Sequence, residues 1–184
     1  MNRFIFFLPL LVSIFGCSWF HPKGTRYLES QRYLVPFVET GKIVDSKRVK
    51  EGGKLYIAPF KAGANVEADD QLDKISLMIV KGILDTLKNE GKSFEILSPD
   101  DASKADLTIE GHVTNIADPS TMRRYVLHNH QKILSVEGKM IDLSNGKTIA
   151  IFTDTQKTAQ KGEDHKYLGL LVGQDIARFL LNRG

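Results

Sequence analysis

The sequence predicts an α+β fold: a two-layer sandwich in which two helices pack on one face of a mostly antiparallel sheet of about four to five strands. Two segments with helical periodicity flank a series of segments in which apolar and polar residues alternate. An Asn145-Gly146 pair between two of the alternating segments adds a hairpin signal. This order favours helices gathered on one side of an antiparallel sheet.

The first predicted strand is the apolar segment 54–60, which ends at Pro59 and a polar turn. A helix follows, because Asp69 and Asp70 offer an N-cap and apolar residues then recur at helical spacing until Gly91. These apolar positions are Leu72, Ile75, Ile79, Ile83 and Leu87. The helix is therefore expected to lie against the sheet.

Three segments with strand-like alternation come next, at 94–97, 107–114 and 132–143. In the second and third, apolar residues and glycines face one way while Thr, Ser, Glu, His and Lys face the other. The polar face is expected to meet water or a partner.

Asn145 and Gly146 join the third of these segments to a strand at 148–153. They predict a type I′ turn, because both central residues of that turn need positive φ. A last helix is expected from about Asp164 to Leu181, with its apolar residues again at helical spacing.

The first 16 residues predict a secretory signal peptide. Arg3 supplies one positive charge ahead of an apolar run from Phe4 to Phe15. A run of about a dozen residues is too short to cross a hydrocarbon core as a helix, which needs about 20. A short basic start followed by an apolar centre is typical of a signal peptide.

Cys17, the only cysteine, follows this run directly, with Ile14 and Gly16 three and one residues before it. This segment resembles the lipobox of bacterial lipoproteins. The resemblance implies a diacylglycerol on the Cys17 thiol, cleavage after Gly16, and a further N-acyl chain such as palmitate on the new amino terminus. Two alternatives stay open: a free thiol or half of an intermolecular disulfide, and a signal peptide or signal anchor without lipid.

The chain is therefore divided into a signal peptide at 1–16, a lipidated cysteine and tether at 17–53, and a globular domain at 54–184. The tether is predicted from its prolines, glycines and scattered charges. Trp19 and Phe20 are candidates for the membrane interface, where amphipathic rings are favoured. The alternative is an ordinary exposed or core-packed pair.

Composition excludes some classes of function. The chain has 25 Lys and Arg against 22 Asp and Glu, a net charge of +3, which gives no clustered basic footprint for nucleic acid. Once Cys17 is lipidated, no thiol remains for disulfides or soft metals. The sequence contains no nucleophile motif, Gly-rich phosphate loop or zinc signature. We therefore expect no enzyme, and no cofactor besides the covalent lipid.

The globular part also resembles a known group of proteins. Segment 55–60, the long helix, segment 105–111, and segment 136–142 with its Asn145-Gly146-Lys147 turn are similar to the periplasmic lipoprotein core shared by the CsgG, PelC and LpoB families. Members serve as secretion-channel subunits, exopolysaccharide-export subunits or activators of cell-wall synthases. The chain lacks the long alternating segments of a transmembrane barrel, so a self-made pore is not expected.

Several polar residues are weighed as sites. His128 and His130 are weak candidates for a metal, but a third ligand at ligand spacing is missing, and a solvated strand edge is favoured. The pairs Asp69-Asp70 and Asp100-Asp101 suit helix caps and turns better than catalysis. Glu110 and Glu137 are expected to be cross-strand neighbours of Lys139 or His112, and these side chains are expected to form surface pairs.

Two further segments draw attention. Arg123, Arg124 and Tyr125 are candidate docking residues for an anionic glycan, a lipid headgroup or a protein carboxylate, with a solvated loop as the alternative. Gly169 and Gly173 form a strip of small residues on the last helix, which predicts close packing of that helix on the sheet.

These observations predict a lipid-anchored, non-catalytic cell-envelope lipoprotein that acts as an assembly, secretion/export or synthase-activating accessory subunit. The alternative is a periplasmic carrier that holds an apolar or glycan ligand between sheet and helices; a metal-dependent enzyme ranks third. The expected partners are the membrane, through the lipid anchor, an envelope protein complex and further copies of the chain, but no nucleic acid. By analogy with lipoprotein sorting, Ser18 after Cys17 implies the periplasmic face of an outer membrane, or the outer face of the plasma membrane in a host without one.

Overall fold

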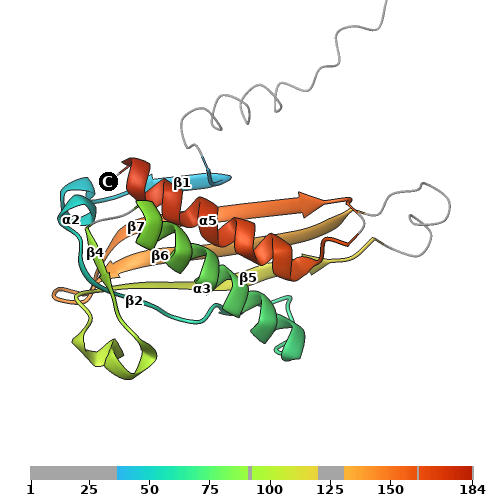
Figure 1. Cartoon of the computed structure of the whole chain (residues 1–184), viewed down its shortest axis with the longest axis horizontal. Helices are drawn as coiled ribbons and strands as arrows, with labels where there is room; N and C mark the ends of the chain where they lie inside the picture. The colour runs from blue at the N-terminus through green and yellow to red at the C-terminus, as the bar shows by residue number, and fades with distance from the viewer. Residues whose placement is uncertain (1–36, 91–92, 120–130, 161, 184) are drawn as a thin grey trace, which may run out of the picture.

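The computed structural model describes residues 37–90, 93–119, 131–160 and 162–183 (Figure 1). Within these ranges two long helices, α3 and α5, lie side by side on one face of a seven-stranded sheet. The predicted α+β sandwich is confirmed, although the sheet has more strands than expected. The elements are β1 (Thr40–Ile43), α2 (Ser46–Glu51), β2 (Gly53–Ile57), β3 (Lys61–Ala62), α3 (Asp70–Glu90), β4 (Phe94–Ile96), the 3-10 helix η1 (Pro99–Lys104), β5 (Leu107–Ala117), β6 (Lys132–Asp142), β7 (Lys147–Thr158) and α5 (His165–Arg183).

The strand order among the described residues is β1-β7-β6-β5-β2-β4, and β3 pairs separately with β5. The long strands β5, β6 and β7 form an antiparallel meander, and β1 adds a fourth antiparallel strand at one edge. The short strands β2, β3 and β4 pair in parallel, so the sheet is mixed. The estimate of four to five strands was too low because β1 and β3 are only four and two residues long. Segments of that length carry too little alternation to be recognised.

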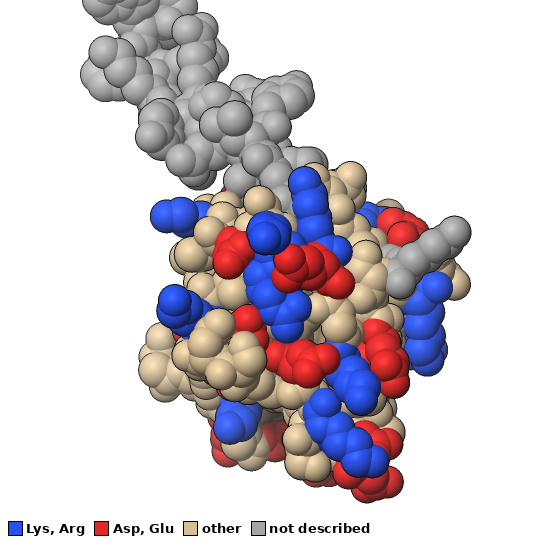
Figure 2. Space-filling view, turned by 90° about the vertical axis from the view of Figure 1, so that its left-hand side faces the viewer, with Lys and Arg blue, Asp and Glu red and all other residues tan. Residues whose placement is uncertain are grey.

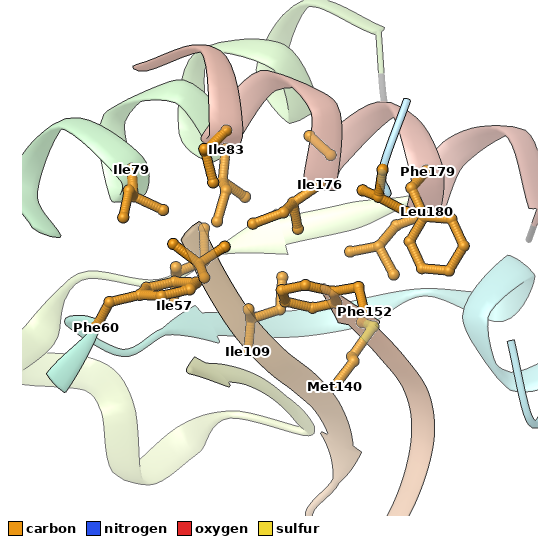
Figure 3. Packing of buried hydrophobic residues seen from close by; sticks show 14 of the residues in the cluster. Ile57, Phe60, Ile79, Ile83, Ile109, Met140, Phe152, Ile176, Phe179 and Leu180 are labelled. Carbon is orange, nitrogen blue, oxygen red and sulfur yellow. The ribbon is translucent and has the colours of Figure 1, made fainter. Parts of the chain in front are cut away.

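Helix α3 forms where its periodicity predicts. The Asp69 carboxylate accepts a hydrogen bond of 2.8 Å from the backbone N–H of Leu72, which caps the first turn. Ile75, Ile79 and Ile83 are fully buried on its inner face. In Figure 3 isoleucines of α3 and residues of α5 point together toward the sheet. The layer between helices and sheet is thus a continuous hydrophobic core.

The small residues of α5 contact α3 and not the sheet, so the prediction for Gly169 and Gly173 was wrong about their partner. A Cβ on Gly173 would lie 2.2 Å from the carbonyl oxygen of Ile79, and one on Gly82 would lie 2.3 Å from that of Leu170. Both neighbours are backbone atoms of the facing helix. The two helices run in the same direction, and glycines on both let their backbones touch.

Three phenylalanine rings fill the space between the sheet and the helices beside glycines of the strands. A Cβ on Gly111 would lie 2.5 Å from the Phe60 ring, and one on Gly138 would lie 2.6 Å from the Phe152 ring. At Gly41 the neighbouring ring belongs to Phe179 of α5, at 2.7 Å. All three rings are buried and are labelled in Figure 3. Glycine is therefore required at these strand positions because an aromatic ring occupies the space of a side chain.

Residues 38–53, predicted as the end of a tether, form part of the domain. Strand β1 pairs with β7, and Val38 and Val49 are buried in the core at 4% and 2% exposure. Arg48 of α2 donates hydrogen bonds from Nε to the Asp142 carboxylate, at 2.9 Å, and from Nη1 to the carbonyl of Gly52, at 2.6 Å. A few buried contacts hold this charged, glycine-rich segment against the sheet.

The turn between β6 and β7 is not of type I′. Gly146 has a φ of 71°, but Phe37 is the only described residue other than glycine with positive φ, so Asn145 does not meet the requirement. The buried Asp142 carboxylate shapes this turn instead. It accepts hydrogen bonds from the Ser144 backbone, at 3.0 Å, and hydroxyl, at 2.7 Å, while the Gly146 N–H donates to the Asp142 carbonyl.

None of the helices in the described part of the chain is both long enough and apolar enough to cross a membrane.

Candidate functional site

Among the residues that the structure describes, no helix or strand covers the sheet face opposite α3 and α5. Alternate side chains of β1, β7, β6 and β5 stand on this face in two rows that cross the strands, as the strand register requires. The first row holds Thr40, Thr153, Glu137 and His112, and the second holds Lys42, Ile151, Lys139 and Glu110. Most of these side chains are exposed, Ile151 at 45%, so this face is available to water or a partner.

A groove of about 500 Å³ lies between the two rows, and we call it the open-face groove. Its floor is the intervening row of the sheet, Gly41, Phe152, Gly138 and Gly111, which pair with one another across the strands. The Phe152 side chain points into the core, and three of the four floor residues have no side chain. Bare backbone therefore forms the floor.

The rim of the open-face groove carries balanced charge. Lys139 Nζ lies 3.0 Å from Glu110 Oε1, and both side chains are 46% exposed. His112 is the register partner of Glu137. Both predicted cross-strand neighbours are thus confirmed. Ion pairs with this exposure contribute little to stability, so these residues are free to serve recognition.

The rim has no net formal charge when His112 is neutral, because it carries two lysines, Lys42 and Lys139, and two glutamates, Glu110 and Glu137. Another side of the molecule, at the α2 and β4 end, is similarly mixed: Figure 2 shows basic and acidic side chains interspersed over it. Neither surface is the single-sign patch that nucleic acid requires.

A second polar cluster lies between β7 and α5, and no pattern in the sequence predicts it. Gln156 Nε2 donates to the carboxylates of both Asp154, at 3.2 Å, and Asp175, at 2.8 Å. The Glu39 N–H also donates to Asp154, at 3.2 Å. Burial raises the pKa of Asp154 to about 7, with a further contribution from the nearby Asp175 carboxylate. Burial likewise raises the pKa of Asp175 to about 6, which Arg178 partly offsets.

Other polar residues have structural roles. His165 is buried, with Nε2 at 3.2 Å from the carbonyl of Ala117 and Nδ1 at 3.4 Å from Gln71 Nε2. Asp101 of η1 binds Ser98 and Lys104 locally, which fits the turn role predicted for the Asp100-Asp101 pair. Within the described residues no group of three or more His, Cys, Asp and Glu side chains is placed to hold a metal ion.

The remaining site residues named from the sequence lie outside the described residues. They are Cys17, Trp19, Phe20, Arg123, Arg124, Tyr125, His128 and His130. Their roles in lipidation, membrane contact, docking and metal binding stay predictions.

Comparison with known proteins identifies a fold. No family model matches the chain, and no curated protein matches it. Among solved structures, the dodecamer of a PelC variant with a single substitution and the PelC dodecamer itself, both from Paraburkholderia phytofirmans, are similar, each with a TM-score of 0.50 and 13% identity. The matches cover 70% and 75% of this chain and 90% and 92% of PelC. The lipoprotein GNA1162 from Neisseria meningitidis matches with a TM-score of 0.45 and 12% identity, over 69% of this chain and 96% of that one. The likeness to PelC shows a shared fold.

Proposed function

We propose that this protein is a lipid-anchored, non-catalytic accessory subunit of the cell envelope whose domain docks into a larger assembly through the open-face groove. The observation that carries the proposal is a charge-bearing sheet face left open on a domain whose opposite face is fully packed. The fold likeness to PelC, a dodecamer, supports an assembling role in secretion or export. Activation of a synthase is a further role that the same geometry permits.

The interior supports docking over carriage of a ligand between sheet and helices. Leu55, Ile79, Ile109, Met140 and Ile176 are all fully buried where such a ligand would lie. Figure 3 shows side chains from both layers meeting in this space. The open-face groove, in contrast, is on the side of the sheet away from the helices, where a large partner has access.

In this proposal, the lipid determines at which membrane the domain is held. A diacylglycerol and an N-acyl chain on Cys17 would hold the chain at the periplasmic face of an outer membrane, or at the outer face of the plasma membrane where that is the only membrane. Two or more acyl chains give firm attachment, with Trp19 and Phe20 at the headgroups. From Cys17 to Phe37 the chain reaches at most about 70 Å when fully extended. Tethering within this reach raises the effective concentration of the domain, so a modest docking surface suffices.

Site-specific photo-crosslinking in the host envelope tests the proposal. A photoreactive amino acid replaces Ile151 in the open-face groove of the full-length chain. The matched control replaces Leu77, which is 67% exposed on α3. We expect a discrete protein adduct from position 151, none from position 77, and a weaker adduct when Cys17→Ser removes the lipid site. Equal adducts from both positions, or no adduct at all, would contradict docking through this groove.

A further inference from the structure

On β5 and β6, the two rows that border the open-face groove carry complementary polar groups at corresponding positions. On β6, Glu137 stands in the first row and Lys139 in the second. On β5, His112 stands in the first row and Glu110 in the second. Each pair spans the glycine floor of the groove. If a second copy of the rim is rotated by 180° so that its strands run in the opposite direction, its two rows exchange places, and a complementary group then lies opposite each of these four residues.

We infer that the partner seated on the open-face groove is a second copy of this chain, related by a twofold axis that runs along the groove floor. The inference rests on the proposed function, since it names the partner of the same surface. The axis brings Glu137 opposite the partner's Lys139, and His112 opposite the partner's Glu110. Each contact occurs twice, as an isologous interface requires.

The remaining positions of the rim fit the same arrangement. Thr153 meets the partner's Ile151, and Thr40 meets the partner's Lys42, so no two like charges face each other. The 3.0 Å contact with Glu110 positions Lys139 within its own copy. A strongly acidic or basic partner would repel two of the four formally charged side chains of this rim, whereas a second copy places no two like charges opposite each other.

The size of the face suits a pair of copies. Strands β5, β6 and β7 have 11 to 12 residues each, which gives a length of about 36 Å at about 3.3 Å per residue. With the shorter β1 and β2 beside them, and strands about 4.8 Å apart, the projected area of the face is roughly 650 Å². A standard interface buries about 800 Å² on each partner. Two copies anchored in one membrane would meet at high effective concentration, which favours pairing.

Charge reversal with rescue tests this pairing. Two differently tagged full-length copies are co-expressed, extracted from membranes in mild detergent and co-purified. Wild-type copies should co-purify. Pairing should fall about tenfold or more when both copies carry Glu137→Lys, or both carry Lys139→Glu, because like charges then meet twice. A copy with Glu137→Lys mixed with a copy carrying Lys139→Glu should regain pairing to within about twofold of wild type.

The matched control reverses an ion pair away from the groove. Lys47 and Glu51 of α2 lie 3.9 Å apart, with side chains 88% and 54% exposed. Lys47→Glu and Glu51→Lys should leave pairing unchanged, and thermal unfolding checks that every variant folds. Absence of wild-type pairing, retention of pairing in the single reversals, or failure of the mixed pair to recover would each overturn the inference.

The crosslinking experiment separates this inference from the proposed function. An adduct from position 151 with a different envelope protein, in copies that do not pair, overturns the second copy as occupant but leaves docking through the groove intact. An adduct between two copies supports both.

Discussion

The backbone contact between α3 and α5 gives the sharpest prediction for stability. In Gly173→Ala the new Cβ would lie 2.2 Å from the carbonyl oxygen of Ile79 and 2.9 Å from the Cα of Gly82. Both are backbone atoms, so no side-chain rotation relieves the clash. The helices must separate by about 1 Å to reach ordinary van der Waals contact.

The expected cost follows from two opposing effects. Overpacking a core typically costs about 1–3 kcal/mol, and a rigid backbone neighbour favours the upper end. Alanine gains about 1 kcal/mol over glycine in a helix interior. The free energy of unfolding should therefore fall by about 2 kcal/mol, which corresponds to roughly 4–8 °C in melting temperature for a domain of this size.

Urea and thermal unfolding followed by circular dichroism measure this change. Gly169→Ala is the matched comparison, because its Cβ would lie 2.9 Å from the Ile75 carbonyl oxygen and should cost less than 1 kcal/mol net. Gly82→Ala, with a 2.3 Å approach, should resemble Gly173→Ala. If Gly173→Ala raised the melting temperature, helix propensity alone would govern this position, and the close packing described above would be refuted.

Three further predictions concern buried charges and the anchor. The free energy of unfolding should fall as pH rises from about 4 to about 7, because the folded state keeps the Asp154 proton up to a pKa of about 7 while the unfolded chain releases it near 3.8, a difference worth at most about 4 kcal/mol. Asp154→Asn should reduce this slope in urea titrations, and an unchanged slope would exclude Asp154 as its source. Asp142→Ala should lower the free energy of unfolding by about 2–3 kcal/mol, because it removes the ion-pair partner of Arg48 and the hydrogen bonds that shape the β6–β7 turn. In the same urea titrations, substitution of an exposed residue, Lys47→Ala, should change it by less than about 0.5 kcal/mol. Cys17→Ser should shift the chain from the membrane to the soluble fraction on cell fractionation, and retention in the membrane would argue against lipid anchoring.

The sequence predicted those helices and strands whose apolar periodicity can be recognised within the segment itself. Helix α3 and strands β5 and β6 were located because long periodic segments bury one face each. Strand β1 and helix α2 were missed because they are only four and six residues long, and their packing depends on contacts with β7 and α5 that are distant in the sequence. The turn type was mistaken because the Asp142 carboxylate supplies hydrogen bonds that a dipeptide signal does not reveal.

The candidate site divides in the same way. The neighbours Glu110–Lys139 and His112–Glu137 followed from alternation in two adjacent strands. The groove itself did not, because it also needs Lys42 and Ile151, brought together by a strand pairing that spans more than a hundred residues. The shared hydrogen bonds of Asp154 and Asp175 likewise join β7 to α5 through a tertiary contact, for which the sequence offers no periodic signal.

Strand β1 has a mechanical consequence. It is the first strand of the described chain, so tension arriving from the amino-terminal side is applied to its four residue pairs with β7 before any other strand. The same four residues include Thr40 and Lys42, one end of each row beside the open-face groove. Load that arrives from the amino-terminal side and the shape of the open-face groove are therefore coupled through one short edge strand. Peeling β1 away would remove a wall of the groove while leaving the β5–β6–β7 meander in place.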